Sequence, residues 1–111
     1  MLDMKMQGRT LLAAISGELD HHAAETLRFE IDRAVMRENA KNIILDFKSV
    51  TFMDSSGIGM IIGRYKNVQK QGGRLFVADI NANLQRIFEL SGLKKIIPLF
   101  DTVETALKEV D

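Results

Sequence analysis

Two kinds of hydrophobic pattern alternate along this chain. Three short apolar runs have the character of buried strands: residues 10–17, 42–47 and 75–78. In the first run, the alternate positions Leu11, Ala13 and Ile15 share one face, while the residues between them are also apolar. This pattern predicts a strand that is buried on both faces. Residues 4–7 are expected to pair with it in a hairpin that turns at Gly8.

Between these runs, apolar residues recur at spacings of three and four, which is the period of a helix. The predicted helices cover residues 22–37, 56–71 and 81–91, and a last helix follows Thr102. Asp20 and the pair Asp101-Thr102 are suitable N-caps, and Gly72-Gly73 and Gly92 are typical of the residues that end a helix. Residues 96–100 predict a short extended segment. Pro98 assigns that segment to the edge or end of a sheet, because it has no N–H to donate.

The order of these elements predicts an α/β fold. Helices that alternate with strands pack against a mostly parallel sheet, to which the N-terminal hairpin adds one antiparallel pair. We therefore expect a single domain over residues 1–111, with a mixed, mostly parallel β-sheet of four to five strands and about four helices. The length of 111 residues suits one domain.

The composition narrows the class of function. The 15 basic and 15 acidic residues balance, so there is no long-range attraction for nucleic acid or for an anionic membrane. The chain has no cysteine, which excludes disulfides and thiolate metal sites. No apolar stretch approaches the roughly 20 residues of a membrane span, and the N-terminus lacks a signal-peptide pattern. The expected location is the cytoplasm.

The most informative polar segment is Asp54-Ser55-Ser56-Gly57. A buried strand over 43–47 is expected to lead through a short loop into the helix that starts near Ser56, at the end of a parallel sheet where α/β proteins place their sites. Free backbone N–H groups at a helix start carry partial positive charge, so a hydroxyl there is well placed to hold a phosphate. A purely structural alternative remains, because Asp and Ser are also preferred helix caps.

Enzymatic and metal alternatives fit the sequence less well. A nucleophile elbow requires Gly-x-Ser-x-Gly and a later histidine, whereas the two histidines, His21 and His22, precede the serines. Adjacent histidines with no cysteine make a poor metal site, and no cofactor motif is found. Gly59 and Gly63 lie one helical turn apart, which predicts close packing of that helix on the sheet. Arg64 is left open, either solvated or paired with an acidic partner.

Three stretches together resemble the STAS domain family, the sulphate transporter and anti-sigma-factor antagonist domains. They are Gly17–Leu27, Phe52–Lys66 and Arg86–Leu93. The resemblance extends over essentially the whole chain and is strongest in the sporulation branch of the antagonists. It implies a STAS-like α/β domain that is not an enzyme and needs no cofactor or metal.

The resemblance also implies a mechanism. Such an antagonist binds an anti-sigma factor that is also a serine kinase, and this binding frees the sporulation sigma factor F. The kinase phosphorylates the first serine after the aspartate, here Ser55, and the phosphorylated form no longer binds. A serine phosphatase of the manganese-dependent class restores the free hydroxyl, while Ser56 caps or orients. The expected partner-binding residues are Asp20, Asp54, Ser55, Ser56 and Gly57.

Two other functions remain as alternatives. One is an antagonist in a stress-response sigma system. His21-His22 and Ser56 favour the sporulation branch over this alternative. The other is a small-ligand or nucleotide-binding STAS domain of the transporter-linked type, which would predict a membrane segment or a fusion partner.

Overall fold

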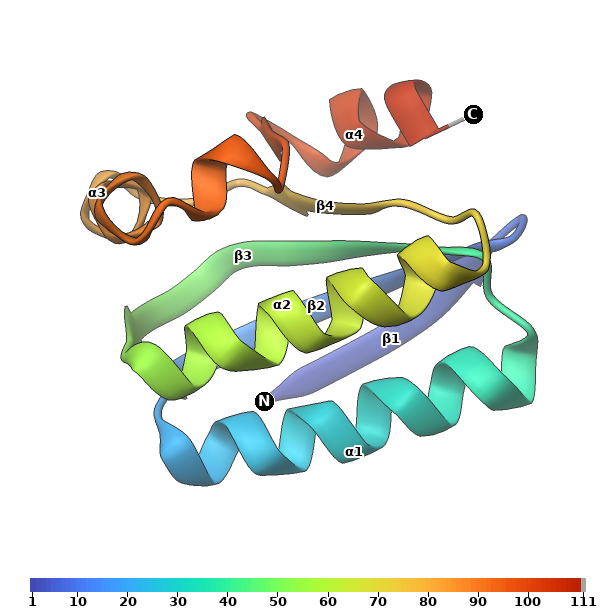
Figure 1. Ribbon diagram of the computed structural model, residues 1–111, viewed down its shortest axis with the longest axis horizontal. Coiled ribbons are helices and arrows are strands. Elements are labelled where there is room, and N and C mark those ends of the chain that lie inside the picture. The colour runs from blue at the N-terminus through green and yellow to red at the C-terminus, as the bar shows by residue number, and fades with distance from the viewer. Residues whose placement is uncertain (111) are drawn as a thin grey trace.

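The fold is a five-stranded sheet with helices on both faces (Figure 1). The computed structural model describes residues 1–110, so Asp111, the last residue of the predicted domain, lies outside the described part. The strands are β1 (Leu2–Gln7), β2 (Thr10–Leu19), β3 (Asn42–Met53), β4 (Leu75–Ala78) and β5 (Leu99–Phe100). The helices are α1 (His21–Glu38), α2 (Ser55–Lys70), α3 (Ala82–Ser91) and α4 (Val103–Val110), with a 3-10 turn, η1 (Leu93–Lys95), after α3.

The strands lie in the order β1-β2-β3-β4-β5, and only β1 runs antiparallel to its neighbour. This arrangement confirms the predicted α/β class and the mixed, mostly parallel sheet. The hairpin at Gly8 is also confirmed, and the φ of +60° at this residue explains why a glycine stands in the turn. β5 lies at the edge of the sheet, as Pro98 predicted, but it is shorter than expected because the N–H groups of Ile96 and Ile97 turn back to the Leu93 carbonyl.

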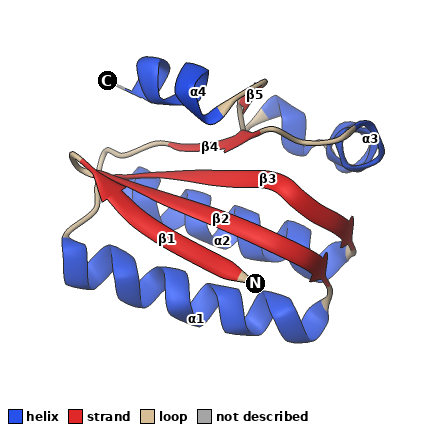
Figure 2. Ribbon diagram, turned by 180° about the vertical axis from the view of Figure 1, so that it is seen from behind, coloured by secondary structure: helices blue, strands red, loops and turns tan. Residues whose placement is uncertain are grey.

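Two hydrophobic clusters flank the sheet. The larger one joins one face to α1, α2 and α3, and it includes Leu11, Ala13 and Ile15 of β2. The smaller one lies under α4 on the other face, where Leu12 meets Ala106 and Val110. Figure 2 shows α1 and α2 on the same side of the sheet, with α4 across from them. The predicted two-sided burial of β2 is therefore confirmed.

β3 is longer than the sequence indicated. The short loop expected after residue 47 is absent, because the strand continues to Met53 and pairs with β2 as far as Leu19. Two irregularities in this pairing shift the register, and they allow Val50 and Met53 to enter the core. The prediction of a short loop was wrong, and Asp54 alone separates β3 from α2.

The glycines of α2 have different roles from those predicted. A Cβ at Gly59 or Gly63 would meet nothing within 4 Å, so neither residue packs closely on the sheet. Gly57 does, because a Cβ there would lie 2.5 Å from Met53 Cγ and 3.0 Å from Leu19 Cγ. The close approach thus occurs where α2 begins, at one of the predicted site residues.

Arg64 joins α2 to α1 from within the fold. Its side chain is 7% exposed, and its Nε lies 2.8 Å from Asp32 Oδ1, although the N–H does not point at the carboxylate as a hydrogen bond requires. Burial lowers the pKa of Arg64, the Asp32 carboxylate raises it, and the nearby Arg28 lowers it again. The guanidinium stays charged, so the choice left open by the sequence is decided in favour of a partner within this chain.

Replacing Asp32 by alanine is expected to lower the free energy of unfolding by about 1–2 kcal/mol, because the buried Arg64 charge loses its counter-charge. The loss is smaller than for a fully buried pair, since the Asp32 side chain is 41% exposed and water screens the interaction. Urea unfolding measures the change. The double variant Asp32→Ala/Arg64→Met should recover most of it, and an Asp32→Ala variant as stable as the parent chain would contradict the role of this pair.

None of the helices in residues 1–110 is long and apolar enough to cross a bilayer.

Candidate functional site

Asp54 fixes the start of α2. Its backbone is extended, with φ −109° and ψ −169°, and its side chain accepts a hydrogen bond from the Ser56 N–H at 2.9 Å. The Asp54 N–H points back to the Leu19 carbonyl at 3.4 Å, which ties this junction to the end of β2. The capping role considered for Asp54 in the sequence is therefore present. A cap that is also tied to the end of β2 gives the adjacent serines a defined position.

The two serines differ in their surroundings. Ser56 is half-buried, and its Oγ lies 3.3 Å from His21 Nδ1, while His21 Nε2 lies 3.5 Å from a Glu25 carboxylate oxygen. Ser55 is exposed, and its hydroxyl makes no hydrogen bond within residues 1–110. The structure thus leaves Ser55 accessible and gives Ser56 a neighbour that orients it.

The segment 17–22 lies at the same end of the sheet as Asp54. Leu19 pairs with Met53 at the ends of β2 and β3, and the helices that follow both strands start side by side (Figure 1). Asp20 is exposed and caps α1 by accepting from the Ala23 N–H at 2.9 Å. A small hollow of about 210 Å³ separates the starts of α1 and α2, and His21 and Ser56 line it. The structure therefore brings Asp20 and 54–57 to one surface.

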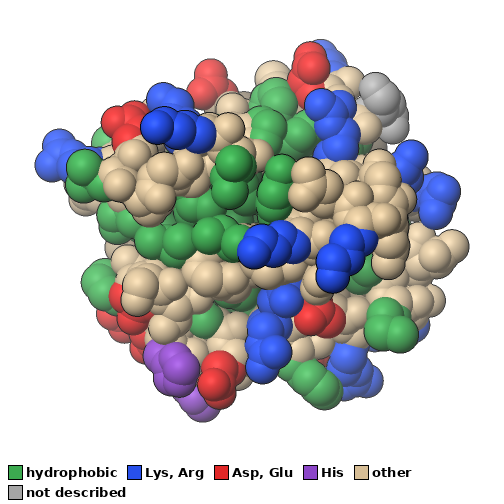
Figure 3. All heavy atoms as spheres, viewed as in Figure 1, with side chains coloured by type: hydrophobic (Ala, Val, Ile, Leu, Met, Phe, Trp, Pro, Cys, Tyr) green, Lys and Arg blue, Asp and Glu red, His purple; other side chains and the backbone are tan. Residues whose placement is uncertain are grey.

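Several apolar side chains on β3, α2 and α3 are exposed or only partly buried, and the sequence analysis did not single them out. Phe52, two residues before Asp54, is 46% exposed. Leu90 on α3 is 82% exposed, and Ile58 and Ile87 on α2 and α3 are only partly buried. Figure 3 shows hydrophobic side chains gathered between α2 and α3.

The sequence signal for these exposed apolar side chains is weak. Phe52 occupies a strand position, and periodicity alone indicates only that one face of a strand is apolar. Whether a neighbouring element covers that face depends on where α3 lies. The role of His21 was missed for a similar reason, because its contact with Ser56 joins residues 35 positions apart.

The sequence-family model of the STAS domain matches residues 1–106 of this chain. The chain belongs to the STAS domain family. It is 40% identical to an anti-sigma F factor antagonist of Paenibacillus polymyxa, over 99% of this chain and 94% of that protein. An anti-sigma-B factor antagonist of Bacillus subtilis is 34% identical over 88% of both chains. Both relatives are regulatory antagonists by name.

Solved structures of the family match the fold closely. The anti-sigma factor antagonist SpoIIAA in its unphosphorylated form is 32% identical, with a TM-score of 0.87 over 99% of this chain and 96% of that one. The phosphorylated form of the Bacillus cell fate determinant SpoIIAA gives a TM-score of 0.78 over the whole of both chains, also at 32% identity. The predicted membership of the STAS family is confirmed.

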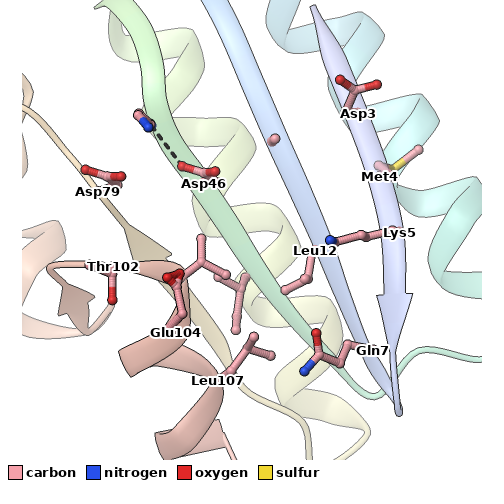
Figure 4. A pocket seen from close by; sticks show the side chains of 14 residues that line it. Asp3, Met4, Lys5, Gln7, Leu12, Asp46, Asp79, Thr102, Glu104 and Leu107 are labelled. Carbon is pink, nitrogen blue, oxygen red and sulfur yellow. Dashed lines mark hydrogen bonds between the residues drawn. The ribbon is translucent and has the colours of Figure 1, made fainter.

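A larger hollow of this STAS domain lies elsewhere. It measures about 880 Å³ and opens between the far face of the sheet and α4, over Leu12 and Ile44 (Figure 4). Four carboxylates and two lysines line it: Asp3, Asp46, Asp79, Glu104, Lys5 and Lys48. Within residues 1–110 no group of three or more His, Asp or Glu side chains is arranged to hold a metal ion. The hollow is therefore separate from the Asp54–Gly57 surface, and its lining carries more acidic than basic side chains.

Proposed function

We propose that this chain is an anti-sigma-factor antagonist whose binding is switched by phosphorylation of Ser55. The unphosphorylated form binds an anti-sigma factor that is also a serine kinase and thereby releases the sporulation sigma factor F. The observation that carries the proposal is the exposed hydroxyl of Ser55 at the start of α2, which makes no hydrogen bond within residues 1–110, in a chain 40% identical to an anti-sigma F factor antagonist. The protein acts as a binding module and kinase substrate, with no cofactor of its own, in the cytoplasm where transcription takes place.

The proposed contact surface combines polar and apolar parts. Asp20, Asp54, Ser55 and Ser56 form its polar part, and Gly57, which is buried, lies behind them. Phe52, two residues before Asp54, is well suited to supply binding energy, because exposed aromatic side chains that become buried dominate many interfaces. Gly57 keeps the start of α2 close to Leu19, so Asp54 and the two serines stay next to the end of β2.

Phosphorylation is proposed to release the partner without refolding. A phosphate adds about −1.5 to −2 charges at neutral pH, beside the carboxylate of Asp54. Within an interface this charge adds repulsion and a desolvation cost. The Ser55 N–H makes no hydrogen bond within residues 1–110 and can donate one to the phosphate at the positive end of the α2 dipole, so the fold need not change. The match to SpoIIAA in both of its forms supports this view.

The proposal includes two enzymes as partners. The anti-sigma factor uses ATP to phosphorylate Ser55, and a serine phosphatase of the manganese-dependent class removes the phosphate. His21 beside Ser56 favours Ser55 as the target, because the Ser56 hydroxyl already has a partner. Neither nucleic acid nor a membrane is part of the proposal, since the 15 basic and 15 acidic residues balance.

The alternatives are weaker. Identity to the sigma-B antagonist is 34%, against 40% to the sigma F antagonist, which favours the sporulation system. A nucleotide-binding STAS domain would need a pocket for a polyphosphate, and the large hollow offers four carboxylates against two lysines. We also propose that residues 1–111 form one domain, which the family match over 1–106 and the single sheet support.

The decisive experiment is intact mass spectrometry after incubation with ATP and the cognate anti-sigma factor kinase. We expect the chain to gain one phosphate and the Ser55→Ala variant to gain none. Ser91→Ala is the matched control, because Ser91 lies at the far end of α3 and its loss should leave the phosphate uptake unchanged. Equal uptake by Ser55→Ala, or none by the parent chain, would reject the proposed switch.

A further inference from the structure

Within residues 1–110, one edge of β1 is unpaired along its whole length. It is the terminal strand of the sheet, and its other side is hydrogen-bonded to β2 (Figure 2). The Ser16 N–H donates to the Met1 carbonyl at 2.8 Å, and these two residues are opposite each other in the extended register. In an antiparallel pair, alternate residues exchange both hydrogen bonds with the neighbouring strand. The odd-numbered residues of β1 therefore face β2, and Leu2, Met4 and Met6 direct their N–H and C=O groups outward.

The side chains of β1 also alternate. Leu2, Met4 and Met6 are half-buried and pack against the larger hydrophobic cluster. Asp3, Lys5 and Gln7 are exposed on the opposite face, and Figure 4 shows Lys5 and Gln7 pointing across the sheet toward β2. The edge thus offers unpaired backbone groups, one partly exposed apolar row and one charged row.

We infer that β1 pairs with β1 of a second copy of this chain. The two strands run antiparallel about a two-fold axis at Met4, so Met4 lies opposite Met4 of the second copy and Leu2 opposite its Met6. In this register, each residue with outward N–H and C=O groups lies opposite another such residue of the second copy. The backbone groups of the two strands can therefore hydrogen-bond to each other. The two sheets become one continuous sheet.

Charge complementarity selects this register. With the axis at Met4, Asp3 lies directly opposite Lys5 of the second copy, and the symmetry repeats the pair. Moving the register by two residues one way places Asp3 opposite Asp3, and moving it the other way places Lys5 opposite Lys5. Like charges directly opposite each other destabilise a pair of strands. Only the central register joins opposite charges while keeping the apolar rows together.

The pairing leaves the functional surface free. Ser55 follows β3, which is two strands away from the edge that would be covered. Each copy in the pair therefore keeps its own Asp54–Gly57 surface, and the inference does not depend on the proposed function. A single strand pair makes a small interface, so we expect an association that depends on protein concentration.

Sedimentation velocity of the full chain over a range of concentrations tests the inference. The mass should rise from 12.5 kDa toward about twice that value as concentration increases. Lys5→Asp and Asp3→Lys each place like charges opposite each other, and each should weaken the association by about tenfold or more. The exchange variant Asp3→Lys/Lys5→Asp should regain it, as should an equimolar mixture of the two single variants, in which unlike chains pair.

The controls separate this edge from other surfaces. Lys48→Asp changes a lysine on the same face of the sheet but on β3, and it should leave the association unchanged. Circular dichroism of every variant confirms that it is folded. A mass of 12.5 kDa at all concentrations would overturn the inference. Association that Lys5→Asp and Asp3→Lys leave unchanged would also overturn it. Failure of the exchange variant to recover would equally overturn the register at Met4.

Discussion

Phosphorylation of Ser55 is expected to weaken binding to the anti-sigma factor by about a hundredfold or more. The phosphate would lie beside Asp54 and next to the half-buried Ser56, at the centre of the proposed contact surface. Adding roughly two negative charges there opposes any partner that approaches closely, through repulsion and lost hydration. A loss of about 3 kcal/mol in binding free energy corresponds to slightly more than a hundredfold.

Isothermal titration calorimetry with the purified anti-sigma factor measures this effect. The phosphorylated chain and a Ser55→Asp variant are compared with the unmodified chain and with Ser55→Ala. Because Ser55→Ala removes only a hydroxyl that makes no hydrogen bond within residues 1–110, it should bind nearly as well as the unmodified chain. Equal affinity of the phosphorylated and unmodified forms would show that the switch works elsewhere.

Gly73→Ala is expected to cost about 3 kcal/mol or more in the free energy of unfolding. A Cβ at this position would lie 1.7 Å from the Lys41 carbonyl oxygen and 3.2 Å from the Val68 carbonyl oxygen. Both backbones are held in place. The Gly73 N–H donates to Val68 at 2.8 Å, and the Lys41 N–H donates to Arg9 at 2.8 Å. Since a side-chain rotation cannot relieve a clash with backbone, the connection from α2 to β4 must move as a whole.

Urea unfolding provides the measurement, and Gly63→Ala provides the control. Gly63 lies within α2, where a Cβ would meet nothing within 4 Å. Alanine there should raise stability by about 0.5–1 kcal/mol, because it reduces the freedom of the unfolded chain and favours the helix. If Gly73→Ala unfolds at the same urea concentration as the parent chain, the close approach to Lys41 is not a constraint on the fold.

Local sequence patterns were sufficient for most of the architecture. Capping and periodicity act within one or two turns, so Asp20, Asp54 and Gly92 marked helix boundaries that the structure confirms. The two-sided apolar pattern of residues 10–17 likewise predicted a strand with helices on both faces. The same signals placed Asp54–Gly57 at the end of a parallel strand, where the structure has it.

Features that join distant parts of the chain were not predictable in this way. β3 runs on to Met53 because β2 offers it backbone partners as far as Leu19, and no local signal reports that neighbour. The sequence around Arg64 is compatible with a solvated side chain and with an ion pair. Only the packing of α2 on α1, which brings Arg64 to Asp32, decides between the two. The close contact at Gly57, rather than at Gly59, depends on where Met53 and Leu19 meet the helix.

By itself, then, the sequence determined the α/β class, the order of the elements and the segment that carries the proposed switch. The tertiary structure decided which of two adjacent serines is free. Ser55 and Ser56 share the same local pattern, and they differ because the ends of β2 and β3 bring His21 within 3.3 Å of one hydroxyl and leave the other exposed. A contact between residues 35 positions apart depends on strand register and helix packing, which no local periodicity encodes.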